Sequence, residues 1–221
     1  VQEGPSIAEI VDGTRYVVTW VDHNGGHNYR YRVFEANGTA VTASLQVNNS
    51  LGVGGAGDDP AVVIGLANGG FVIAWYEFST ALQDRQGVSI HAQIYDGAGG
   101  QVGNEFVVNS MFKSHQAFPD LVALPDGGFV AVWSDSALGV NSADYSITGQ
   151  RFDAFGARVG TQFTVNTATD GANGEFYPHI SALADGRLVV IWRGPNEVRT
   201  QIIDVRDGLV TGTEDANTLY G

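Results

Sequence analysis

The sequence predicts an all-β protein, and within that class a β-propeller of four blades. Three observations support this: a phrase that recurs four times, a proline that opens each repeat, and short apolar runs separated by glycine-rich turns. The phrase ends each time on a tryptophan, at Trp20, Trp75, Trp133 and Trp192. The prolines Pro5, Pro60, Pro119 and Pro178 open units of residues 5–59, 60–118, 119–177 and 178–212. Repetition at a fixed period is typical of propellers. A β-sandwich is the alternative, which the equal spacing disfavours.

The first predicted element of each unit is a short apolar strand directly after the proline. These strands cover residues 6–11, 61–66, 120–124 and 179–183. A turn signal follows, at Asp12-Gly13, Asn68-Gly69, Asp126-Gly127 and Asp185-Gly186. Such pairs supply the positive φ angles of a two-residue type I′ turn, so each one predicts a β-hairpin.

The second strand of each unit ends on the tryptophan. In residues 71–75 (FVIAW) and 129–133 (FVAVW) every position is apolar. An antiparallel strand with one face in water alternates apolar and polar residues, whereas a strand covered on both faces need not. Stacked propeller blades cover both faces of an antiparallel sheet. We therefore expect the tryptophan to lie in the core of a blade.

Two further strands complete each predicted blade. The predicted third strands lie within residues 29–38, 91–99, 148–156 and 200–208. The predicted fourth strands of the first three units lie at residues 45–48, 106–109 and 163–166. The fourth strands end on Asn48, Asn109 and Asn166, whose side chains we expect to bond nearby backbone.

The fourth unit departs from this pattern. Its residues aligned with the apolar fourth strands read Asp215-Ala216-Asn217. We therefore expect an irregular last blade and a separate C-terminal segment over residues 213–221. An incomplete blade leaves an exposed sheet edge, through which the chain could form a homodimer by edge pairing.

Charge and composition exclude several classes of partner. The chain has 24 Asp and Glu against 11 Lys and Arg, a formal charge of −13. This charge repels phosphate backbones, so we exclude nucleic acid, and it attracts cations such as calcium. No apolar run approaches the length of a membrane span, so we expect no membrane insertion. Cysteine is absent, which rules out disulfides and thiolate metal sites.

Three phrases carry a family resemblance: GQRFDAFGARVGTQFTVN (149–166), PDLVALPDGGFVAVW (119–133) and GTEDANTLYG (212–221). They resemble repeats of large secreted bacterial proteins of the RTX, or hemolysin-type calcium-binding, kind, and the last phrase is similar to the opening of an RTX array. In it, Ala216 and Asn217 replace the Gly-x-Asp that would help bind metal. The resemblance implies secretion, an extracellular location, calcium dependence, and roles in adhesion or polymer degradation.

Acidic residues are the predicted calcium ligands. Asp22, Glu77 and Asp135 stand two positions after a tryptophan, and equivalent positions of a propeller form a ring. Calcium takes several oxygen ligands, which such a ring could supply. Asp58 and Asp59 form a second candidate in a glycine-rich loop. The alternative in both cases is that these carboxylates solvate loops. His23 and His27 lack a third ligand, which disfavours zinc.

Aromatic residues near the same strand ends are the predicted ligand-binding set: Tyr76, Phe118, Tyr145, Phe176 and Tyr177. Aromatic faces beside polar side chains suit the binding of sugar rings. The alternative is that an aromatic residue before proline packs the crossing between blades.

The sequence contains no nucleophile, zinc-protease or phosphate-loop motif. His179 and Arg193 fall in the last unit, and Tyr177 directly precedes it. These three are the weak catalytic candidates, as base and neutraliser of a uronate lyase. We therefore expect a non-enzymatic extracellular binding or adhesion module that presents loops to glycan or another surface ligand. A polysaccharide-degrading lyase or hydrolase is the first alternative, and a purely structural spacer is the second.

Overall fold

The computed structural model describes residues 1–10, 13–24, 26, 28–48, 59–78, 87–112, 115–136, 145–166, 174–206 and 217–219. These residues form four antiparallel sheets of four strands each, one per repeat. The first blade contains β1 (Gln2–Ile10), β2 (Arg15–Asp22), β3 (Asn28–Glu35) and β4 (Leu45–Gln46). The second contains β5 (Val62–Gly65), β6 (Phe71–Phe78), β7 (Val88–Tyr95) and β8 (Gln101–Val107). The third contains β9 (Gln116–Ala123), β10 (Phe129–Asp135), β11 (Ser146–Phe152) and β12 (Arg158–Thr164). The fourth contains β13 (Phe176–Ala182), β14 (Leu188–Arg193), β15 (Val198–Ile203) and β16 (Asn217–Leu219).

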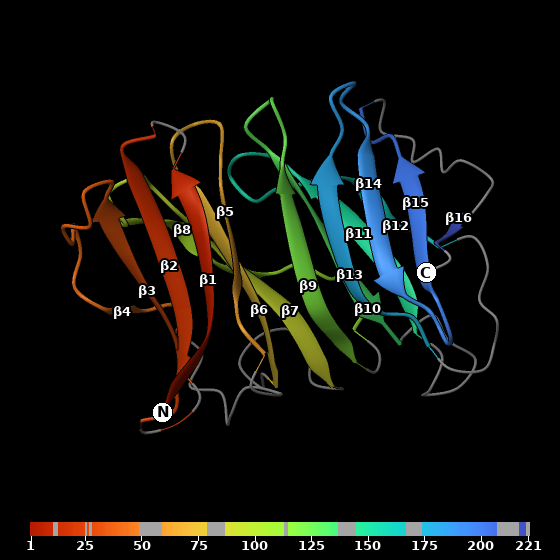
Figure 1. The fold of residues 1–221 in the computed structure, drawn as a ribbon, viewed down its shortest axis with the longest axis horizontal. Helices are drawn as coiled ribbons and strands as arrows, with labels where there is room; N and C mark the ends of the chain where they lie inside the picture. The colour runs from red at the N-terminus through yellow and green to blue at the C-terminus, as the bar shows by residue number, and fades with distance from the viewer. Residues whose placement is uncertain are drawn as a thin grey trace.

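The four sheets are propeller blades, which confirms the predicted fold. The first strands pack on one another in order, β1 on β5, β5 on β9 and β9 on β13. The blades therefore follow each other across the molecule, from the first at the left of Figure 1 to the fourth at the right. Within the described part of the chain, no helix is long and apolar enough to span a bilayer.

Each second strand in the middle of the molecule has two buried faces. In β6, Phe71, Ile73 and Trp75 pack against the first blade, whereas the residues between them pack against the third blade. We call the tryptophan side of a blade its leading face and the opposite side its trailing face. β10 is likewise buried at every position. This burial on both faces explains why FVIAW and FVAVW do not alternate.

Three of the four tryptophans are fully enclosed. Trp75 and Trp133 are 0% exposed and Trp192 is 2% exposed, as expected for blade-core residues. Trp20 is only partly buried. The phrase is the same in each unit, so the difference arises from what covers the blade, and the first blade has no preceding blade in the described part of the chain.

The hairpin turns differ from the predicted type I′ turns. Positive φ occurs at the glycine alone, at Gly13, Gly69, Gly127 and Gly186, and the described Asn and Asp residues before them have negative φ. The Gly69 N–H donates to the Leu66 carbonyl at 3.0 Å, which closes a type I turn ahead of the glycine. The Asn68 side chain accepts from the Gly70 N–H at 3.0 Å. The prediction of type I′ geometry was wrong because Asx-Gly pairs serve both turn types.

The predicted structural role of three asparagines is confirmed. Each side-chain oxygen accepts the backbone N–H near the start of the third strand of its own blade: Asn48 from Tyr29, Asn109 from Ile90 and Asn166 from Ile147, at 3.3, 3.0 and 2.7 Å. Each asparagine thus fastens the end of the fourth strand to the third.

The expected irregularity of the fourth blade does not appear in its strand count. It has four strands like the others, and its outer strand β16, of three residues, is no shorter than β4, of two. β16 pairs with β15, with Leu219 opposite Val198. Part of the segment that we expected to be separate from the propeller, residues 213–221, therefore supplies the last strand of the blade.

Candidate functional site

One rim of the propeller collects the residues that the sequence singles out. At this rim, which we call the Trp rim, the second strands end just after their tryptophans and the first and third strands begin. In each blade the second strand runs antiparallel to the first and third, so its end lies beside their starts. The opposite rim, which we call the turn rim, carries the hairpin turns between the first and second strands.

The five predicted ligand-binding aromatic residues form one connected cluster on the Trp rim. The ring centroids of Phe118 lie 4.3 Å from Tyr177, 5.5 Å from Tyr76 and 6.4 Å from Phe176. Tyr145 stands 4.5 Å from Phe176 at the far end. These residues come from three different blades. The structure therefore brings the predicted set together, from positions up to 101 residues apart in the chain (177 − 76).

Two members of the cluster have strained backbone. Phe118 has φ 57° and Tyr177 has φ 55°, and they are the only non-glycine residues with positive φ among those described. Each precedes the repeat proline and sits at a β-bulge between the first and second strands. In the first blade the same position is Gly4, with φ 58°. Side chains at such φ values cost of order 1–3 kcal/mol, and this strain concentrates at functional sites.

The cluster has an exposed end and an enclosed end. Tyr177 is 46% exposed, which is high for so large an apolar side chain. Tyr76 is 4% exposed, and its hydroxyl donates a short hydrogen bond to Asp59. Burial raises the pKa of Tyr76, and the Asp59 carboxylate adds to the effect. Asp59 is thus held beside the aromatic cluster. Asp58, its predicted partner in a calcium site, lies outside the described residues.

An aspartate that the sequence analysis did not select lies next to the cluster. Asp120 accepts hydrogen bonds from the N–H groups of Leu121 and Ile180, both at 2.9 Å, and its Oδ2 lies 3.4 Å from His179 Nδ1. Burial raises the pKa of Asp120 despite these contacts. Asp120 and His179 stand two residues after Phe118 and Tyr177 on β9 and β13. The sequence feature that could have identified Asp120 is its position as the one charged residue of the predicted first strand at residues 120–124.

The three weak catalytic candidates lie on two adjacent strands. Tyr177 and His179 are on β13, and Arg193 is on β14 opposite Phe176. The side chain of His179 is 72% exposed. Within the described contacts, His179 meets Asp120 on the neighbouring blade, whereas Tyr177 packs on Phe118. The geometry therefore pairs His179 with an acid, a pairing that the lyase hypothesis did not include.

The predicted calcium ring does not converge on one point. Among the described residues, the only group of three or more possible metal ligands close enough to share an ion joins Glu77 to His91 and Glu105, and it contains neither Asp22 nor Asp135. Asp22 lies 3.1 Å from Arg30, and the Asn24 N–H, donating to it at 3.0 Å, lowers its pKa. Asp135 accepts from Gln116 and from the Trp133 indole, at 3.2 and 3.3 Å. Each carboxylate belongs to a different blade and is bound by local donors.

The third predicted acid, Glu77, belongs to a buried group on the second blade. Glu77, His91 and Glu105 have ligand atoms within 4.8 Å of one another. His91 Nδ1 lies 2.9 Å from Glu105 and 3.9 Å from Glu77, while its Nε2 lies 2.8 Å from Ser89 Oγ. A nitrogen with two carboxylates suits zinc or another transition metal better than calcium. The same geometry also suits a buried hydrogen-bonded network without a metal, in which His91 joins Glu105 to Ser89.

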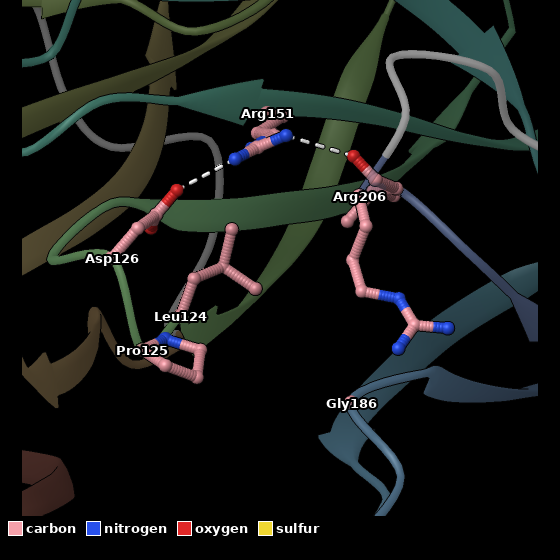
Figure 2. A pocket seen from close by; sticks show the side chains of 7 residues that line it. Leu124, Pro125, Asp126, Arg151, Gly186 and Arg206 are labelled. Atoms are coloured by element: carbon pink, nitrogen blue, oxygen red, sulfur yellow. Dashed lines mark hydrogen bonds and ion pairs between the residues drawn. The ribbon is translucent and has the colours of Figure 1, made fainter.

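A pocket on the turn rim lies between the third and fourth blades. It encloses about 230 Å³, and Figure 2 shows its lining side chains, which include Leu124, Asp126, Arg151 and Arg206. Arg151 donates to the Val205 carbonyl at 2.8 Å and to Asp126 at 2.6 Å, so it links the two blades.

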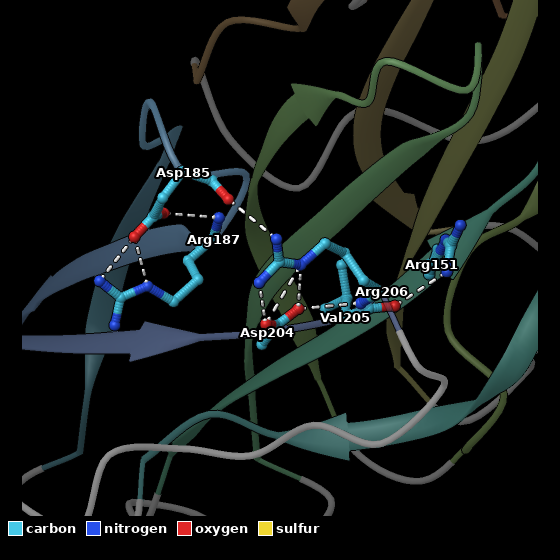
Figure 3. Close-up of polar contacts among 6 residues, drawn as sticks. All are labelled: Arg151, Asp185, Arg187, Asp204, Val205 and Arg206. Atoms are coloured by element: carbon cyan, nitrogen blue, oxygen red, sulfur yellow. Dashed lines mark hydrogen bonds and ion pairs between the residues drawn. The ribbon is translucent and has the colours of Figure 1, made fainter.

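The second arginine of the pocket is also held by protein groups. Arg206 binds Asp204 and donates to the Asp185 carbonyl at 2.8 Å (Figure 3). The hydrogen bond from the Arg206 side chain lowers the pKa of Asp204 to about 2. Because both guanidinium groups of the pocket are engaged in this way, we interpret the turn-rim pocket as structural.

Comparison with known proteins identifies the fold. No family model and no curated protein matches the chain. Solved structures of propeller glycoside hydrolases do match. An α-L-arabinanase of Penicillium chrysogenum complexed with arabinobiose superposes with a TM-score of 0.65 at 11% identity, covering 96% of this chain and 66% of that one. An α-L-arabinofuranosidase of Fusarium graminearum with arabinobiose gives 0.63 at 11% identity, covering 98% and 68%.

A xylan β-1,4-xylosidase of Bacillus halodurans gives a TM-score of 0.56 at 16% identity. The match covers 98% of this chain but only 42% of the xylosidase. Identities this low establish a shared propeller fold and no shared residues of a site.

Proposed function

We propose that this chain binds polysaccharide through the aromatic cluster on the Trp rim. The observation that carries the proposal is the exposed ring of Tyr177, which lies beside Phe118 on strained backbone. A protein that needed only packing at this position could use glycine, as the first blade does at Gly4. Keeping an aromatic side chain there costs backbone strain and leaves an apolar ring in water, which a ligand that covers the ring would offset.

Sugar rings are the class of ligand that this surface fits best. A sugar offers an apolar C–H face to an aromatic ring and hydroxyl groups to polar side chains around it. Asp59, Asp120 and His179 supply such polar groups beside the rings. The solved neighbours bound to arabinobiose support the same class.

The test is binding to a panel of soluble arabinan, xylan and acidic polysaccharides by affinity electrophoresis. Tyr177→Ala should remove the retardation that the wild-type chain shows. Phe155→Ala is the matched control, because Phe155 is 80% exposed and lies in a turn away from the cluster. Equal retardation of the wild type and of Tyr177→Ala, or no retardation of the wild type by any polymer, would contradict the proposal.

Polysaccharide degradation is the second candidate, and the comparisons favour it over a binding-only module. The neighbours named above are glycosidases, and Asp120 supplies a specific observation on this chain. A glycoside hydrolase needs one carboxyl group that stays protonated long enough to act as general acid. Burial raises the pKa of Asp120 in that direction, beside the exposed His179.

Release of reducing ends from the polysaccharide that binds best tests this candidate. Asp120→Asn should abolish release and retain binding, because the amide keeps the shape of the side chain but cannot donate the proton. Binding without any release by the wild type would leave the adhesion-module function, and neither binding nor release would favour the spacer.

Calcium dependence and secretion rest on the RTX resemblance, and we propose them on that basis. Thermal unfolding in calcium and again in EDTA tests the first of these. An equal melting temperature in both would exclude a structural calcium ion. Recovery of the chain from the culture medium of intact producing cells tests the second.

A further inference from the structure

The first blade presents a leading face that no described part of the chain covers. The three hydrophobic clusters of the core fill the interfaces between blades one and two, two and three, and three and four. None of them joins the fourth blade to the first. The leading face of the first blade and the trailing face of the fourth therefore lie at opposite ends of the row of blades (Figure 1).

This open leading face is constructed like the covered ones. Tyr16 on β2 stacks on Phe34 of β3, with ring centroids 5.2 Å apart and planes at 10°. The equivalent pairs are Phe71–Tyr95 in the second blade, at 4.9 Å and 12°, and Phe129–Phe152 in the third, at 5.0 Å and 14°. Both covered pairs are buried between blades. Within the described residues, the first blade thus displays the same stacked pair without a neighbouring blade to bury it, and the Arg32 guanidinium of the same blade lies 5.4 Å from the Phe34 ring centroid.

The degree of exposure at one equivalent position makes the contrast quantitative. On each first strand, one apolar residue lies on the leading face and pairs with the second-strand residue two positions before the tryptophan. It is Ile7, Val63, Leu121 or Ile180, with exposures of 65, 5, 4 and 8%. Ile7 alone lacks cover.

Among the described residues, the trailing face of the fourth blade is the other open surface. Ile191 is 37% exposed and Val198 is 44% exposed. Their equivalents in the second blade, Ala74 and Ile90, are 0% exposed because the third blade covers them. An apolar surface that its own repeat buries elsewhere is an interaction surface.

We propose that these two faces bind each other between two copies of this chain, head to tail. Within the chain, the trailing face of one blade packs against the leading face of the next blade three times. The proposed contact joins the trailing face of the fourth blade of one copy to the leading face of the first blade of another in the same way. The contact is heterologous, so it joins different surfaces of the two copies and either closes a ring or continues. It buries sheet faces, whereas the edge pairing expected from the sequence would join sheet edges.

Cross-linking at two engineered thiols tests the orientation. The chain has no cysteine, so Ile7→Cys and Ser181→Cys each carry a single thiol. Within the chain, Ala8 on the trailing face of the first blade packs in one cluster with Val63 on the leading face of the second. Ser181 is the equivalent of Ala8 in the fourth blade, and Ile7 is the equivalent of Val63 in the first. A short bismaleimide should therefore link the two variants when they are mixed.

The expected result is a cross-linked dimer in the mixture and only monomer from either variant alone. Cross-linking of one variant to itself at the yield of the mixture would show a different contact, and monomer throughout would show none. Either result would overturn the proposal.

Sedimentation equilibrium tests the same contact without a cross-linker. Ile7→Lys places a charge in the proposed interface and should raise the dissociation constant by about tenfold or more. Phe155→Lys is the control, because it makes the same kind of change at an 80% exposed position outside both open faces. Thermal unfolding shows that each variant is folded. Association of Ile7→Lys equal to that of the control, or a monomeric wild type, would overturn the proposal.

Discussion

At the scale of single residues, the position before the repeat proline combines structural cost with exposure. Phe118 and Tyr177 keep left-handed backbone there, and Tyr177 keeps nearly half of its surface in water. Stability alone would favour glycine at such a φ, since glycine has no Cβ to clash.

Tyr177→Gly should therefore stabilise the chain and impair its function. We expect the free energy of unfolding to rise by about 1 kcal/mol, from relief of backbone strain, while polysaccharide binding is lost. Tyr177→Ala is the control, since alanine loses the ring but keeps the strain, and it should not be stabilised. Urea unfolding measures the free energy of unfolding of both variants. A glycine variant less stable than the wild type would show that packing of the ring stabilises the chain by more than the backbone strain destabilises it.

Asp120 makes stability depend on pH in a defined direction. Because its pKa is raised in the folded state, folding favours the protonated carboxyl, and this contribution is complete only below the ordinary value of 3.8. It is lost as the pH rises through the raised pKa. Melting temperatures of the wild type relative to Asp120→Asn should therefore fall as the pH increases from about 3 to 7. A melting temperature of the wild type that rises with pH relative to that of Asp120→Asn would contradict the raised pKa.

At the scale of elements, what covers a strand decides its burial, even where the local sequence repeats. β2 and β6 both end in the tryptophan phrase, yet Trp75 is enclosed by the first blade and Trp20 is partly exposed. The four-fold phrase was sufficient to predict the strands, the blades and the core role of three tryptophans. It could not predict the exposure of Trp20, because that depends on a neighbour and not on the phrase.

Matched alanine substitutions test this difference. Trp75→Ala should destabilise the chain by about 3–5 kcal/mol, because it leaves a cavity between two blades. Trp20→Ala should cost clearly less in dilute solution, where the leading face of the first blade is open. Urea unfolding of both variants provides the measurement, and equal losses would mean that Trp20 is as enclosed as Trp75.

The site shows the same division between what the sequence can and cannot predict. Aromatic residues before proline and after tryptophan were recognisable from the repeat alignment, and they do meet. Asp120 was not recognisable as an acid with a raised pKa, because its burial comes from packing between β9 and β13. The three predicted acids do not form one group of ligands for a related reason, since Asp22 and Asp135 find donors within their own blades.

At the scale of the whole molecule, stability should be graded from the centre to the ends. The second strands of the second and third blades are buried on both faces, whereas among the described residues the first blade has an open leading face and the fourth an open trailing face. Local opening follows such differences in burial.

Hydrogen exchange should follow this gradient. Amides of β14 and β15 should exchange at least about tenfold faster than those of β10 and β11. Mass spectrometry of peptides from each blade measures the rates. Uniform rates in all four blades would indicate a single cooperative unit and would count against an open fourth blade.

The residue ahead of each repeat proline also has a consequence for how such a protein can change. It reads Gly4, Asp59, Phe118 and Tyr177 in the four units, while the strands on either side keep their pattern. A mutation at this position alters what one blade presents on the Trp rim and leaves the hydrogen-bonded ladder of that blade in place. The chain thus carries one adjustable position per repeat. Selection can alter these positions one at a time, so specificity for a ligand can diverge without a change of scaffold.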